Sequence, residues 1–217
     1  MGEFDALMTY RASRVDALIP ARFRGGFDGL RECGIVDWAI LERCRLWAED
    51  FGPETQKGLY MSGPVGTGKS GLAFAIARRL IERGVTPCAY VFDDLLAEIR
   101  STYRDKSGNS EAEIIEECES TPVLILDDLG AERVTDHSTR ILYTIVNRRY
   151  NSLRPVIITS NLSGGQLLDR ARELAAAQGE MGEAYRVLER IVSRLCEMVE
   201  GVPLVGQDRR KSRKGGG

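Results

Sequence analysis

Residue patterns that mark several common protein classes are missing from this chain of 217 residues. It has a single histidine, His137, and its five cysteines are scattered without a C-x-x-C pair, which argues against a structural zinc site and a disulfide framework. No apolar run approaches about 18 residues, the length that spans a membrane, and residues 1–10 lack the pattern of a secretory signal. We therefore expect a cytoplasmic protein with reduced thiols and no membrane association.

An excess of charge is also missing. The chain has 30 Lys and Arg residues against 32 Asp and Glu residues, which gives a net charge of -2. This balance argues against a protein that attracts nucleic acid over its whole surface, so any such surface must be local. A short basic run, residues 209–214, precedes the terminal glycines. It is compatible both with a disordered, solvated tail and with weak phosphate binding.

The clearest feature that the chain does contain is a glycine-rich loop. It matches the pattern G-x-x-x-x-G-K-[ST] with the residues Gly63, Pro64, Val65, Gly66, Thr67, Gly68, Lys69 and Ser70. In such a loop the backbone N–H groups cradle phosphate oxygens, the lysine reaches the β- and γ-phosphates, and the hydroxyl binds Mg²⁺. Residues 58–62 are predicted to form a strand before the loop, and a four-residue apolar spacing predicts a helix over residues 70–83 after it. This context favours nucleotide binding over the alternative, a glycine turn with a solvated lysine.

Strand and helix patterns alternate along the rest of the chain. Further strands are predicted at residues 88–92, 123–126, 155–161 and 202–205. Helices are predicted at residues 95–103, 111–120, 138–150 and 163–199, the last with an interruption near Gly179 and Gly182. The alternation predicts an α/β fold with a parallel, doubly wound sheet of about five strands.

The N-terminal part has no motif of its own. Residues 36–50 are predicted to be helical, and residues 19–23 to be extended, because Pro20 disfavours the helical conformation of the residue before it. We expect residues 1–52 to be a helical extension packed on the core. Residues 53–210 would form the ATPase domain, and residues 211–217 a basic disordered tail.

Polar side chains end two of the predicted strands. Asp127 and Asp128 follow the apolar run 123–126, and Asn161 ends the strand 155–161. Because the carboxyl ends of parallel strands share an edge, we expect Asp127 to hold Mg²⁺ through water, and Asp128 to polarise the water that attacks ATP. Asn161 would bond that water and the γ-phosphate. The alternatives are a turn with a helix cap for the acids and an Asx cap for Asn161.

Five segments together support a family resemblance. They are residues 63–70, 124–132, 147–150, 158–163 and 190–195, and they include the strings D-D-L-G-A-E, T-S-N and R-I-x-S-R-L in that order. They resemble the DnaC/DnaI helicase-loader and IstB-like branch of the AAA+ ATPases. The resemblance implies a three-layer P-loop NTPase without a separate lid domain, which binds ATP and Mg²⁺ between subunits of an oligomer assembled around DNA.

The resemblance also implies roles for individual residues. Asn161 resembles sensor 1, and Arg194 resembles the arginine finger that reaches a neighbouring subunit's γ-phosphate. The spacing of Arg190 and Arg194 by itself indicates only that both project from one side of a helix. Arg210 resembles a terminal sensor arginine. Asp128 stands where many AAA+ proteins have the longer glutamate, so slow hydrolysis is expected.

The segment between residues 92 and 123 lies where related proteins carry a helical element that faces single-stranded DNA. Its cationic side chains are Arg100, Arg104 and Lys106. They are suited to tracking phosphates, although a solvated helix end is an equally good interpretation.

The resemblance predicts an ATPase that loads a replicative DNA helicase. Two alternatives stay open: an IstB-like transposition helper on duplex DNA, and a non-hydrolytic adapter switched by ATP. The segment 167–189 is longer than is typical of this branch, and only about 57 residues precede the first strand. The sequence therefore does not separate a helicase from a transposase as the partner, and leaves the oligomer size open.

Overall fold

The computed structural model describes residues 13, 15–103, 109–130, 135–177 and 183–206. One sheet contains the strands β1 (Gly58–Ser62), β2 (Cys88–Val91), β3 (Leu124–Leu129), β4 (Val156–Ser160) and β5 (Val199–Pro203). The strands lie in the order β2-β3-β4-β1-β5, and each neighbouring pair is parallel. The predicted parallel α/β sheet is confirmed.

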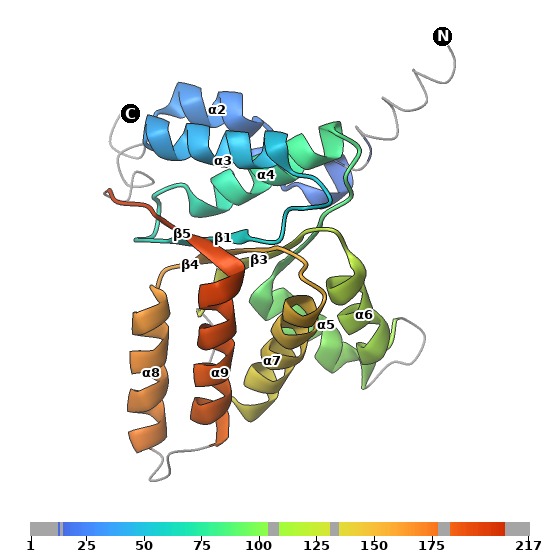
Figure 1. Ribbon diagram of the computed structural model, residues 1–217, viewed down its shortest axis with the longest axis vertical. Helices are drawn as coiled ribbons and strands as arrows, with labels where there is room; N and C mark the ends of the chain where they lie inside the picture. Colours follow the sequence, from blue (N-terminus) through green and yellow to red (C-terminus); the bar gives the residue numbers. More distant parts are fainter. Residues whose placement is uncertain (1–12, 14, 104–108, 131–134, 178–182, 207–217) are drawn as a thin grey trace, which may run out of the picture.

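Helices cover both faces of the sheet. They are η1 (Ala21–Phe23), α2 (Gly26–Cys33), α3 (Trp38–Asp50), α4 (Lys69–Glu82), α5 (Phe92–Thr102), α6 (Glu111–Ser120), α7 (Asp136–Asn151), α8 (Gly164–Ala177) and α9 (Glu183–Met198). Figure 1 shows α2, α3 and α4 on one side of the sheet and α5 to α9 on the other. Within the described residues, no helix has the length and apolar character needed to cross a membrane.

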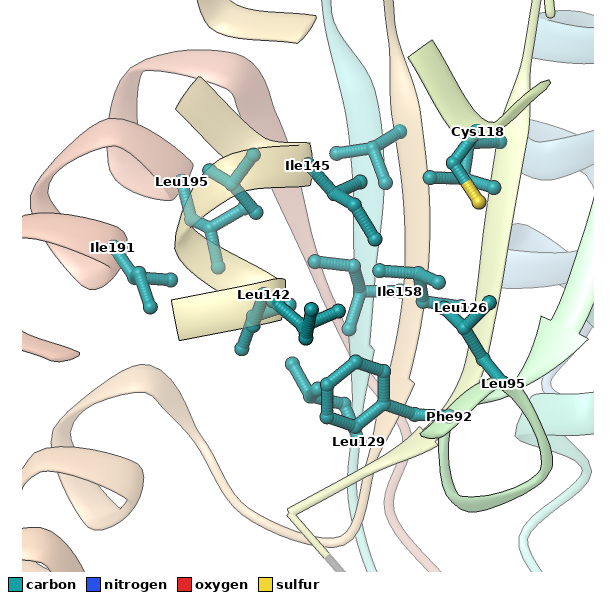
Figure 2. Packing of buried hydrophobic residues seen from close by; sticks show 14 of the residues in the cluster. Phe92, Leu95, Cys118, Leu126, Leu129, Leu142, Ile145, Ile158, Ile191 and Leu195 are labelled. Atoms are coloured by element: carbon teal, nitrogen blue, oxygen red, sulfur yellow. The ribbon is translucent and has the colours of Figure 1, made fainter. Parts of the chain in front are cut away.

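The central strands β1, β3 and β4 are mostly apolar because both of their faces are buried. Alternate residues enter two hydrophobic clusters: Ile125 and Ile157 pack with the α4 layer, whereas Leu126 and Ile158 pack with the α5 to α9 layer. In the second cluster, side chains of α7 and α9 gather over the sheet near those of α5 (Figure 2). The sheet is thus held rigidly between two cores, which fixes where its strand ends lie.

The N-terminal segment differs from the sequence prediction. Pro20 is extended, with φ -53° and ψ 139°, but residues 21–23, which were also expected to be extended, form η1, and the chain continues into α2. The reason is tertiary packing, because Phe23, Phe27 and Leu30 contact the same hydrophobic cluster as α4. Burial of these side chains outweighs the low helix propensity of the glycines around them.

A fully buried arginine ties α7 to the chain that enters β3. The guanidinium of Arg149 donates to five backbone carbonyls, at 2.6 to 3.3 Å. They belong to Cys118, Glu119, Thr121, Pro122 and Pro155. Burial lowers the pKa of Arg149 to about 10, so the side chain is cationic at neutral pH. Two of these carbonyls end α6, where a positive charge favours the helix dipole.

Candidate nucleotide-binding site

The glycine-rich loop joins β1 to α4. Gly63 has φ 149° and Gly68 has φ 96°, a conformation that favours glycine. A Cβ atom on Gly63 would overlap the carbonyl oxygen of Leu204, and one on Gly68 would lie 2.8 Å from Cγ2 of Val36. The two glycines therefore let the loop pass close to the chain on either side.

Lys69 lies buried at the start of α4. Its Nζ donates to the carbonyls of Gly63 and Pro64, both at 2.8 Å, and to Oδ1 of Asn161 at 2.9 Å. The hydroxyl of Thr67 donates to the same Pro64 carbonyl at 2.9 Å. These bonds fold the loop around the ammonium group and link it to the end of β4.

The two predicted acids lie beside this group. The side chain of Asp127 is buried, and its Oδ1 accepts a hydrogen bond of 2.6 Å from the Thr159 hydroxyl. Asp128 has a left-handed backbone, φ 59°, and its Oδ1 accepts a bond of 3.1 Å from Nδ2 of Asn161. The amide of Asn161 thus bridges Lys69 and Asp128. The expectation that β3 and β4 present these side chains together agrees with the geometry.

A cavity of about 670 Å³ opens at this group of residues. Val65, Gly66, Gly68, Lys69, Ser70, Asp127, Asp128 and Asn161 line one part of it. The other part is lined by the N-terminal segment, including Phe23, Gly26 and Ile35, which the sequence analysis missed. Phe23 stacks on Phe74 of α4 with 5.2 Å between ring centroids. The apolar spacing of Phe27 and Leu30 was the available signal for α2, but the glycines around it masked the signal.

A family model described as IstB-like ATP binding protein matches residues 46–211. The chain belongs to this family. The match includes the loop, both acids, Asn161 and Arg194, whereas the N-terminal wall of the cavity, with Phe23 and Ile35, lies outside the matched residues.

Relatives of this IstB-like chain include two replicative helicase loaders. DnaC of Escherichia coli K12 is 29% identical over 140 residues, which cover 61% of this chain and 56% of DnaC. DnaI of Bacillus subtilis 168 is 28% identical over 155 residues, 71% of this chain and 48% of DnaI. The chain thus spans about half the length of these relatives. A crystal structure of the DnaC helicase loader superposes with a TM-score of 0.61 and 29% identity, over 77% of this chain and 89% of that chain.

The cavity of this IstB-like chain fits ATP with Mg²⁺. Helix α4 begins after Gly68, a cap residue that has no side chain to accept a bond from the N–H groups of the first turn. Such a helix start favours phosphate. The Ser70 hydroxyl and the Asp127 carboxylate line the same cavity and supply the oxygen ligands that Mg²⁺ prefers.

Arg194 of the IstB-like domain lies away from this cavity, on α9, and is not one of the described residues that line it. Its guanidinium carbon lies 5.3 Å from the ring centroid of Tyr143 and 5.6 Å from that of Tyr150, both on α7. Nη1 donates to the Arg190 carbonyl at 3.3 Å. A hydrogen bond to Glu197 raises the pKa of Tyr150. The side chain is half-buried against the two rings.

Of the remaining predicted residues, the structure describes Arg100 alone. Arg100 is exposed on α5. Arg104, Lys106 and Arg210 lie outside the described residues.

Proposed function

We propose that the chain binds ATP with Mg²⁺ in the cavity at the glycine-rich loop, hydrolyses it slowly, and uses this cycle to load a replicative DNA helicase. The observation that carries the proposal is the amide of Asn161, which bonds both Lys69 and Asp128. A neutral side chain between the lysine and the acid can hydrogen-bond both a γ-phosphate and a water held by Asp128. Membership in the IstB-like ATP-binding family supports the same assignment.

The residues that line the cavity would have different roles in phosphoryl transfer. Bound Mg²⁺ would neutralise charge on the phosphates, and Ser70 and Asp127 are the residues that would hold it. The N–H groups at the start of α4 would bind phosphate oxygens, and Lys69 would exchange its carbonyl acceptors for the outer phosphates. Asp128 would orient the attacking water. Phe23 and Ile35 form an apolar part of the cavity wall, which suits the adenine base of ATP.

We further infer that Arg194 completes the site of a neighbouring subunit in a homo-oligomer. Two observations support the inference: Arg194 is not among the described residues that line the cavity of its own chain, and its guanidinium lies over the rings of Tyr143 and Tyr150. It follows that ATP would lie between subunits. Arg100, with Arg104 and Lys106, is proposed to contact single-stranded DNA through its phosphates.

An ATPase assay tests the hydrolysis step. Phosphate release by the wild type should exceed background in the presence of single-stranded DNA, and Asp128→Asn should lower it by about 10²-fold or more, the typical contribution of a positioned proton acceptor. Binding of a fluorescent ATP analogue should be retained by the variant. Wild-type activity equal to background, with ATP binding intact, would instead favour a non-hydrolytic adapter.

A co-purification experiment tests the partner. The tagged chain is mixed with the replicative helicase of its own organism and, separately, with an IS21-type transposase, with and without ATP. We expect the helicase to be retained in an ATP-dependent manner by the wild type and not by Lys69→Ala. Retention of the transposase alone, together with a preference for duplex DNA, would assign the chain as an IstB-like transposition helper. Retention of neither protein would contradict both assignments.

A further inference from the structure

Three consecutive side chains at the end of β4 form hydrogen bonds to residues at the end of β3. The Thr159 hydroxyl donates to Oδ1 of Asp127, the Ser160 hydroxyl donates to the Leu129 carbonyl at 2.6 Å, and the Asn161 amide donates to Asp128. The sequence analysis gave Asn161 a role and left the other two without one. Thr159 and Ser160 are both fully buried.

These bonds span a break in the pairing of the two strands. Leu126 pairs with Ile158 and Leu129 pairs with Ser160, so β3 has two residues in the interval where β4 has one. An extra residue of this kind interrupts the backbone ladder and redirects side chains. The two residues on the bulged strand are Asp127 and Asp128. The bulge is therefore the feature that turns both acids toward the cavity edge.

The Thr159 hydroxyl holds both residues of the bulge with one atom. Its proton goes to Asp127 at 2.6 Å, and its oxygen accepts the N–H of Asp128 at 2.9 Å. The left-handed backbone of Asp128, φ 59°, costs about 1 to 2 kcal/mol for a residue with a Cβ, so it needs such an anchor. With Oδ1 fixed, the carboxylate of Asp127 cannot rotate freely in the cavity that it lines.

We propose that Thr159 is a positioning residue, which orients Asp127 toward Mg²⁺ and fixes the backbone of Asp128. This assignment rests on the proposed function, in which Asp127 holds the metal ion. The role requires a hydroxyl at this position, since only a group that donates and accepts at once can serve both neighbours. A residue that orients a metal-holding carboxylate affects metal affinity without contacting the metal.

The test compares Thr159→Val, which keeps the shape and loses the hydroxyl, with Thr159→Ser, which keeps the hydroxyl. Binding of a fluorescent non-hydrolysable ATP analogue is titrated with Mg²⁺ and repeated in EDTA. We expect Thr159→Val to need about 10- to 100-fold more Mg²⁺ for half-maximal enhancement of binding, the range for lost outer-shell contacts. Affinity in EDTA should be unchanged, and Thr159→Ser should behave as the wild type.

Ser160→Ala is the matched control. Its hydroxyl is equally buried and bonds the Leu129 carbonyl and the Leu162 N–H, but it touches neither carboxylate. We expect this variant to melt at a lower temperature with the wild-type Mg²⁺ dependence. If Thr159→Val does not fold, Thr159→Ala also removes the hydroxyl and carries the same expectation.

Three outcomes would overturn the proposal, and they distinguish the role of Thr159 from the metal-binding role of Asp127. An unchanged Mg²⁺ dependence in Thr159→Val, with a clear shift in Asp127→Asn, rejects the role of Thr159 alone. An equal shift in Ser160→Ala also rejects it, because any disturbance of the bulge would then suffice. An unchanged Mg²⁺ dependence in Asp127→Asn removes the metal role itself, and with it both the proposed function of Asp127 and this inference.

Discussion

On the α4 side of the sheet, glycines bring the chain close to its neighbours, and Lys69 is surrounded by three oxygen acceptors. On the opposite side, Arg194 lies against the faces of two tyrosine rings and makes one hydrogen bond to a carbonyl of its own helix. Figure 1 shows the two sets of elements separated by the sheet. The Lys69 ammonium is enclosed by two backbone oxygens and one side-chain oxygen, whereas the Arg194 guanidinium lies half-buried against aromatic rings.

In the proposed mechanism, ATP binding and ATP hydrolysis therefore depend on different parts of the molecule. The enclosed site is built largely from backbone groups of one chain, so it can recognise phosphates alone. Tyr143 and Tyr150, the platform beneath Arg194, have no role in that recognition, because they are not among the described residues that line the cavity. Substitutions around Lys69 should therefore lower the affinity for ATP, whereas substitutions around Arg194 should lower the rate of hydrolysis and leave the affinity unchanged.

The largest effect is expected from Arg194→Ala. The rate of ATP hydrolysis should fall by about 10³- to 10⁵-fold, the contribution of an arginine supplied from a neighbour in related phosphoryl-transfer enzymes. The affinity for ATP should not change. The measurements are kcat by phosphate release and Kd by fluorescence titration, with Arg190→Ala, one turn earlier on α9, as the control.

Mixing subunits tests whether the two sides act between chains. Arg194→Ala supplies an intact cavity and Lys69→Ala supplies an intact arginine, so equal amounts of the two inactive variants should recover part of the activity. Recovery that never exceeds the sum of the separate variants would contradict shared sites.

Lys69→Ala should give the opposite pattern. Removal of this buried ammonium should cost about 2–5 kcal/mol of ATP binding free energy, the usual cost of truncating one partner of a buried charge pair. Isothermal titration measures the loss, and the exposed Lys57→Ala serves as control. A wild-type Kd for Lys69→Ala would mean that the loop is not the phosphate site.

The features that could be predicted from the sequence are those encoded locally. The loop at residues 63–70 is a contiguous motif, and Asp127, Asp128 and Asn161 each follow an apolar strand, so the shared edge of a parallel sheet brings them together. The strand β3 was predicted because burial on both faces requires an unbroken apolar run.

The features that could not be predicted depend on contacts distant in sequence. The cavity wall at Phe23 and Gly26 forms only when the segment packs on α4, and glycines there disfavour helix in isolation. The bulge at Asp127 needs the hydroxyl of Thr159 on another strand. The sequence does not predict the burial of Arg149 either, because the adjacent Arg148 has the same chemistry and lies on the surface.

Two adjacent arginines of α7, Arg148 and Arg149, should differ in their contribution to the free energy of unfolding. Arg149→Met should lower the free energy of unfolding by about 3 kcal/mol or more, because several buried carbonyls lose their donor and each costs about 1 to 3 kcal/mol. Urea denaturation measures the change. Arg148→Met removes an exposed ion pair to Glu119, and should cost less than about 1 kcal/mol. Equal costs would contradict a structural role for the buried side chain.

The smallest effect is expected from substitutions of Tyr143 and Tyr150, the two tyrosines beneath Arg194. Tyr143→Leu or Tyr150→Leu should slow hydrolysis by about 3- to 30-fold, the range of a single cation–π contact, while ATP affinity stays constant. Tyr143→Phe keeps the ring face and should retain the wild-type rate. Tyr150→Phe also loses the bond to Glu197, so a partial effect there would measure how far that carboxylate steadies the ring. A change in ATP affinity in any of these variants would contradict the separation of the two sides, because the platform would then act on the cavity of its own chain.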